Sequence, residues 1–102
     1  MIKQDTLENR AKLVYLGIGS NLGNKKINIE KAKFQIEKKG IKIEACSSYY
    51  ETDSWPNNNF PKYFNIVLRV KTFFKPQDLL KKIKEIEILI GRKMSFKNYS
   101  IK

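Results

Sequence analysis

The chain has 102 residues, of which 41% are hydrophobic and 12% aromatic, and its formal net charge is +11. That length allows one small domain, and the apolar content excludes a chain that is disordered throughout. No apolar run approaches the roughly 20 residues that a membrane-spanning helix needs, and the polar start is not that of a signal peptide, so we expect a cytoplasmic protein.

Two side-chain counts narrow the chemistry further. The chain contains no histidine, which excludes a Ser-His-Asp triad and the usual zinc sites. Cys46 is the single cysteine, and we expect it to be a small buried side chain within a strand.

The positive charge has two possible explanations. The 21 Lys+Arg against 10 Asp+Glu allow either a polyanionic partner or lysines on solvated faces. We favour the second, because nucleic-acid binders use clusters of arginine with aromatic residues between them.

The first predicted element is a strand over Lys12–Ile18, whose nearly continuous apolar run is typical of a strand covered on both faces. Residues 1–11 before it are expected to form a flexible leader. A glycine-rich turn follows, and then a helix from about Asn24 to Lys39. Its apolar face consists of Ile29, Ala32 and Ile36, while Ile27 and Phe34 fall near the opposite face.

Two more strands and a helix are predicted after Gly40. The strands span Ile41–Thr52 and Phe64–Thr72, with a loop over Asp53–Pro61 between them. The helix spans Pro76–Ile90, because proline suits a first helical turn, Gly91 ends the pattern, and a clean apolar stripe lies between them. The tail from Arg92 to Lys102 is basic and shows no clear period.

The predicted order is therefore β-α-β-β-α, within a single domain over residues 12–102. This is an α/β (α+β) arrangement, the ferredoxin-like split β-α-β sandwich with its final strand missing. In that topology the last strand pairs beside the first. We therefore expect the strand Leu13–Ile18 to have an unpaired edge, which invites self-association.

Three stretches are candidates for chemistry. The first is the loop of Gly19, Ser20 and Asn21, between a strand and a helix N-terminus, where glycines permit close approach of a ligand and the helix favours anions. It is not a dinucleotide fingerprint, since the third glycine of that motif would fall on Leu22, and no Walker lysine follows. A plain strand-to-helix turn is an equally good interpretation.

The second stretch gathers aromatic residues and a carboxamide, namely Trp55, Tyr63 and Asn65. Aromatic faces and an amide suit a flat heterocycle, although a core edge and a loop cap explain the same residues slightly better on chemistry alone. The third stretch contains Glu87, Arg92 and Lys97. Its basic residues suit phosphates, and the alternative is a solvated basic tail with a surface ion pair.

Five segments in this order resemble one family, the 6-hydroxymethyl-7,8-dihydropterin pyrophosphokinases. The resemblance runs from about Val14 to Asn98. The segments are Y-L-G-I-G-S-N-L-G-N, Ser48–Thr52, Phe60–Asn65, Pro76–Leu80, and Ile86–Glu87 with Gly91–Arg92.

The resemblance implies a function in folate biosynthesis, the transfer of a pyrophosphoryl group from ATP to the hydroxymethyl group of the pterin, with release of AMP. It also implies a ferredoxin-like fold and Mg²⁺ as the metal ion. Pterin contacts are implied for Thr52, Trp55, Tyr63 and Asn65, a mobile loop for Gly19, Ser20 and Asn21, and ATP contacts for Glu87, Arg92 and Lys97. Arg92 is the one candidate catalytic residue.

The chain departs from the family at three places. The family has a proline where Asp53 stands and a second phosphate-binding arginine where Met94 stands. After a segment like Lys97–Asn98 the family continues with Pro-Arg and an Asp-x-Asp strand that holds two magnesium ions, whereas this chain reads Tyr99 to Lys102. We therefore expect a truncated domain without metal ligands and with little transfer activity.

Two alternatives stay open beside the enzyme. One is a catalytically inactive remnant or pterin-binding module, because the pterin positions are present. The other, which we favour less, is a small basic RNA-binding domain of ferredoxin-like fold. The aromatic strand signature of that class is absent from the sequence, so nucleic acid is not the partner we expect.

Overall fold

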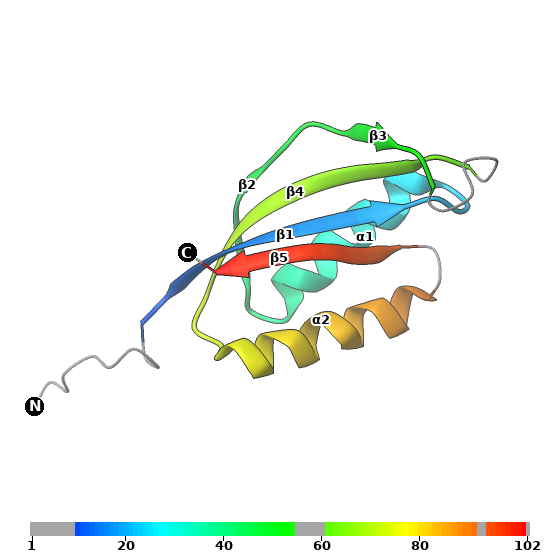
Figure 1. The fold of residues 1–102 in the computed structure, drawn as a ribbon. Coiled ribbons are helices and arrows are strands. Elements are labelled where there is room, and N and C mark those ends of the chain that lie inside the picture. Colours follow the sequence, from blue (N-terminus) through cyan, green and yellow to red (C-terminus); the bar gives the residue numbers. More distant parts are fainter. Residues whose placement is uncertain (1–9, 55–60, 92–93, 102) are drawn as a thin grey trace, which may run out of the picture.

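The computed structural model describes residues 10–54, 61–91 and 94–101 (Figure 1). Most of the expected leader, residues 1–9, lies outside the described residues. The first strand, β1 (Lys12–Ser20), extends two residues further than predicted. The helices α1 (Lys25–Lys38) and α2 (Pro76–Ile90) confirm the predicted helical segments. Gly91 follows α2 at φ +84°, a backbone conformation that glycine adopts without strain, so the predicted helix stop is confirmed.

The central strand of the sheet is β4 (Tyr63–Thr72), which pairs antiparallel with β1 along the whole length of β1. On its other side β4 pairs antiparallel with β2 (Lys42–Cys46) and with β3 (Tyr50–Thr52). Because β1 and β2 are both antiparallel to β4, they run parallel to each other with β4 between them. This is the split β-α-β arrangement that the sequence predicted.

Both helices cover one face of the sheet (Figure 1). Alternate residues of β1 and β4 point at this helical layer, as the period of a strand requires. The core consists of these strand residues, the apolar stripes of the two helices, and two residues from connections: Val14, Leu16, Ile18, Ile66, Leu68, Val70, Ile29, Ala32, Ile36, Leu79, Ile83, Ile86, Ile41 and Met94. The other residues of β4, among them Asn65, belong to the opposite face.

The C-terminal tail contains a strand, and this corrects the sequence prediction. β5 (Ser95–Ile101) pairs antiparallel with β1, giving the sheet order β2-β4-β1-β5. The final strand of the ferredoxin-like fold is therefore present. The edge of β1 that we expected to be unpaired is occupied, so self-association through that edge has no structural basis.

An irregularity in the register explains why β5 was missed. The pairing shifts between Gly17 and Ile18, and Lys97 has no opposite residue in the ladder. The positions opposite the core residues Ile18, Leu16 and Val14 are consequently Phe96, Tyr99 and Ile101. Their spacing is three and then two residues, so a bulge has interrupted the period of two on which strand prediction relies.

The predicted strand over Ile41–Thr52 is divided into β2 and β3. Ser47 causes part of this division, because its Oγ atom accepts a hydrogen bond from the backbone N–H of Val67 at 2.8 Å in place of a backbone carbonyl. A second shift of register between Ile43 and Ala45 changes which residues face the helices.

Cys46 lies at the end of the edge strand β2 and is exposed, so the expectation that it is buried was wrong. On α1, Ile27 and Phe34 are 49% and 64% exposed, which agrees with their place opposite the apolar stripe. In the part of the chain that the structure describes, no helix combines the length and the apolar content needed to cross a membrane.

Candidate functional site

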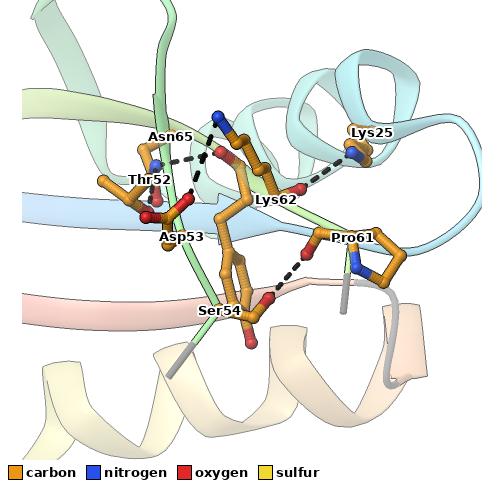
Figure 2. Close-up of polar contacts among 8 residues, drawn as sticks. Lys25, Thr52, Asp53, Ser54, Pro61, Lys62 and Asn65 are labelled. Atoms are coloured by element: carbon orange, nitrogen blue, oxygen red, sulfur yellow. Dashed lines mark hydrogen bonds and ion pairs between the residues drawn. The ribbon is translucent and has the colours of Figure 1, made fainter. Parts of the chain in front are cut away.

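The amide of Asn65 is the centre of a polar network on the face of the sheet away from the helices. Asn65 is 3% exposed. Its Nδ2 atom donates to Thr52 Oγ1 at 3.0 Å (Figure 2), and also to the backbone oxygens of Tyr50 at 3.2 Å and Tyr63 at 3.3 Å. Three acceptors around one nitrogen fix which way the amide is turned, so the Oδ1 atom is the end that would meet a donor group on a ligand.

Backbone pairing brings these residues together. Thr52 is opposite Tyr63 in the β3–β4 ladder, two residues before Asn65. The sequence predicted that Thr52, Tyr63 and Asn65 share a site, and the fold places them in contact. Thr52 is exposed and Tyr63 is half-buried, so the network is buried at Asn65 and open at its rim.

A row of three residues crosses the sheet at the level of Asn65. Gly19 of β1 is opposite Asn65 on one side and opposite Ser95 of β5 on the other. Adjacent strands lie about 4.8 Å apart, so Asn65 and Ser95 are about 10 Å from each other, with only a glycine between them. Ser95 was missed in the sequence, because its place in the row depends on the strand β5.

The loop that follows Gly19 is held by the start of α1. Asn28 is buried, and its Nδ2 atom donates to Ser20 Oγ at 3.2 Å and to the backbone oxygen of Leu22 at 2.8 Å. Asn24 caps the helix by accepting a hydrogen bond from the N–H of Ile27 at its side-chain oxygen. Gly23 takes the one positive φ of the loop, +64°. Ser20 is fully buried, so the loop is held in place through its contacts with the protein interior.

Lysine side chains lie at the start of α1 against two aromatic rings. Lys25 Nζ is 5.1 Å from the ring centre of Phe64, and Lys26 Nζ is 5.4 Å from that of Tyr49. Lys25 Nζ also donates to the backbone oxygen of Lys62 at 2.8 Å (Figure 2). These contacts stabilise two cations at a helix N-terminus, where the helix dipole disfavours them.

The Asp53 carboxylate, in the position where the family has proline, lies 3.8 Å from Lys62 Nζ (Figure 2). Both side chains are more than half exposed, so this ion pair contributes little to stability. Burial, and then a hydrogen bond from its hydroxyl to Glu30, raises the pKa of Tyr49 to about 12. Tyr49 therefore stays neutral at physiological pH.

Of the predicted phosphate-side residues, only Glu87 has a side chain that the structure describes. Glu87 belongs to α2, and its Oε2 atom accepts a hydrogen bond from the backbone N–H of Phe96 at 2.9 Å. This bond joins the end of α2 to the start of β5. Arg92 and Trp55 lie outside the described residues, and of Lys97 only the backbone is described, within β5.

A magnesium site would require several oxygen ligands that converge on one point. Among residues 10–54, 61–91 and 94–101, no group of three or more histidine, cysteine, aspartate or glutamate side chains is placed to hold a metal ion.

Most of the chain matches a protein-family model. The family model of 7,8-dihydro-6-hydroxymethylpterin-pyrophosphokinase matches residues 15–101. The 2-amino-4-hydroxy-6-hydroxymethyldihydropteridine pyrophosphokinase of Aquifex aeolicus is 44% identical over 84 residues, which are 82% of this chain and 52% of that protein. The protein of the same name from Porphyromonas gingivalis is 31% identical over 80 residues, covering 78% of this chain and 54% of its own length.

A longer relative and a solved structure complete the comparison. The folic acid synthesis protein FOL1 of Dictyostelium discoideum is 40% identical over 86 residues, which are 84% of this chain and 13% of that protein. The crystal structure of an unknown protein from Galdieria sulphuraria superimposes with a TM-score of 0.57 at 16% identity, covering 90% of this chain and 48% of that one. This last likeness concerns the fold alone. The chain spans about half the length of these two pyrophosphokinases.

Proposed function

Because the chain belongs to the 7,8-dihydro-6-hydroxymethylpterin-pyrophosphokinase family, we propose that it binds 6-hydroxymethyl-7,8-dihydropterin and serves pyrophosphoryl transfer from ATP in folate biosynthesis. The observation that carries this proposal is the buried Asn65 amide, whose nitrogen is held by three acceptors of the protein. A pterin ring presents a 2-amino group and a ring N–H on one edge. Both are donors, and the Oδ1 atom of Asn65 is the matching acceptor.

Other residues around Asn65 have distinct parts in this proposal. Thr52 holds the amide by accepting from Nδ2 at 3.0 Å and thereby positions the recognition group. Tyr63, half-buried at the start of β4, supplies an aromatic surface on which a ring can pack. The loop of Gly19, Ser20 and Asn21 lies beside Asn65 through the β1–β4 pairing and would contact the same ligand.

The proposal also assigns residues to the ATP phosphates. Arg92 and Lys97 would hold ATP phosphates, since transfer of this kind depends on positioning and charge neutralisation. Glu87 would act indirectly, because its hydrogen bond to the Phe96 amide holds the connection between α2 and β5, in which Arg92 lies. In the family two magnesium ions neutralise phosphate charge, and the described residues contain no group of three or more histidine, cysteine, aspartate or glutamate side chains placed to hold one.

Calorimetric titration with 6-hydroxymethyl-7,8-dihydropterin tests the pterin site. The chain is expected to bind with a saturable heat, and the Asn65→Ala variant is expected to lose it, since the ring edge loses its acceptor. No heat at high micromolar pterin would refute the proposal. Release of AMP from ATP in the presence of Mg²⁺ and pterin then separates an enzyme from a module that binds pterin without transfer.

A further inference from the structure

Ser54 is a buried hydroxyl within an exposed stretch of chain. It is 5% exposed, whereas Asp53 and Pro61 are exposed. Its Oγ atom donates to the backbone oxygen of Pro61 at 2.5 Å (Figure 2) and accepts from Asn21 Nδ2 at 3.5 Å. A hydroxyl offers one donor and two acceptor sites, so both contacts are made at once.

These two contacts connect residues on different sides of the proposed pterin site. Asn65 is opposite Gly19 in the β1–β4 ladder, and its amide bonds Thr52. Asn21 is two residues beyond Gly19, and Ser54 is two residues beyond Thr52. Because β1 and β3 are both antiparallel to β4, the segments that follow them leave the sheet on the same side of β4's first residues, and the contact between Asn21 and Ser54 links these two segments.

The two contacts differ in strength. The short bond to Pro61 orients the Ser54 hydroxyl firmly, while the contact to Asn21 is long and correspondingly weak. Lys25 joins the same two segments further along, through its 2.8 Å bond to the Lys62 carbonyl. Loss of Ser54 would therefore loosen the loop after Gly19 without separating it from β4.

From this arrangement we infer that Ser54 is a positioning residue for the pterin site, an inference that rests on the function proposed above. By holding Asn21 in place, it fixes the loop after Gly19 relative to the Asn65 amide before the ligand arrives. The affinity for pterin is then higher, because less of the loop has to become ordered when the ligand binds. A neutral hydrogen bond of ordinary length corresponds to about a three- to tenfold change in affinity, which sets the upper limit for this long contact.

Five variants, one of them a control, and two measurements test the inference. Calorimetry gives the pterin dissociation constant, and backbone ¹⁵N relaxation of the ligand-free chain gives the order parameters of residues 21–23. We expect Ser54→Ala and Asn21→Ala each to weaken binding by about two- to tenfold. Ser54→Thr, which keeps the hydroxyl, should stay within about twofold of the wild type, and the double variant should be no weaker than Ser54→Ala.

The order parameters supply a readout that does not require ligand. Those of residues 21–23 should fall in Ser54→Ala and stay unchanged in Ser48→Ala, a matched change in the exposed connection between β2 and β3. Unchanged order parameters in Ser54→Ala, wild-type pterin affinity in that variant, or full additivity in the double variant would each overturn the inference. If Ser54→Ala does not fold, Asn21→Ala carries the same comparison.

The two proposals fail in different ways. A wild-type chain that binds no pterin would refute the proposed function and with it any role of Ser54 in binding. The order parameters would still decide whether Ser54 holds the loop. Conversely, pterin binding that is insensitive to Ser54→Ala would refute the positioning role and leave the proposed function intact.

Discussion

The Nδ2 atom of Asn65 lies 3.0 Å from the Oγ1 atom of Thr52, so a side-chain hydrogen bond joins the central strand β4 to the short strand β3. The bond needs a donor at position 65. Two backbone carbonyls also accept from the same nitrogen, so an acceptor in its place would face three oxygens.

We therefore predict that Asn65→Asp lowers the free energy of unfolding by about 1–3 kcal/mol, because a carboxylate at this buried position would face three oxygen atoms with no donor to offer them. Urea denaturation followed by circular dichroism measures this loss. Asn24→Asp is the matched control, since the N-cap of α1 uses its side chain as an acceptor and aspartate caps equally well. Equal stability of the wild type and Asn65→Asp would contradict the network.

The bond between Glu87 and the Phe96 amide gives a second prediction. Glu87→Ala removes a charged acceptor that holds the start of β5, and we expect the free energy of unfolding to fall by about 1–2 kcal/mol. Glu85→Ala on the same helix removes only an exposed ion pair with Lys39 and should cost much less. Losses of similar size in the two variants would show that the Glu87 contact does not form.

The fold was predictable from the sequence where the period of the apolar residues was regular. The stripe of α2 and the alternation of β4 gave the helix and the strand with nearly their observed bounds. β5 was missed because the unpaired Lys97 shifts the alternation by one residue. The division of β2 from β3 was missed because it depends on where the Ser47 hydroxyl points, which no local pattern records.

The candidate site was predictable in part for the same kind of reason. Thr52, Tyr63 and Asn65 were selected through a family resemblance, and strand pairing brings them together. Ser54 and Ser95 carried no signal of their own, because serine is common in loops. Ser54 is placed beside the site by its contact with Asn21, and Ser95 by its pairing with Gly19. Arg92 and Trp55 stay predictions, since they lie outside the described residues.

Core packing gives a third prediction. Leu16 is fully buried at the centre of β1, so Leu16→Ala removes apolar contacts and leaves a cavity. We expect the free energy of unfolding to fall by about 2–5 kcal/mol in chemical denaturation. Leu89→Ala is the matched control, because Leu89 is 63% exposed on α2. A loss below that of Leu89→Ala would contradict the placement of β1 in the core.

The pKa of Tyr49 gives a prediction for alkaline pH. Burial, and then the hydrogen bond to Glu30, raises this pKa from its ordinary value of 10.0 to about 12, so the folded state favours the neutral phenol. Its contribution to stability is complete below about pH 10 and is lost as the pH rises toward 12. Tyrosinate absorbance should show a step near pH 12 that Tyr49→Phe lacks. A step of the same size in that variant would contradict the assignment.

The central claim is that the pterin ring is recognised at Asn65, on the face of the sheet away from the helices. Titration of the ¹⁵N-labelled chain with 6-hydroxymethyl-7,8-dihydropterin, followed by NMR, tests it most directly. We predict that the side-chain amide signals of Asn65 and the backbone signals of Gly19 and Thr52 shift together with one dissociation constant. Signals that stay in place at these residues, or that shift instead along the helical face at Ile27 and Leu89, would contradict it.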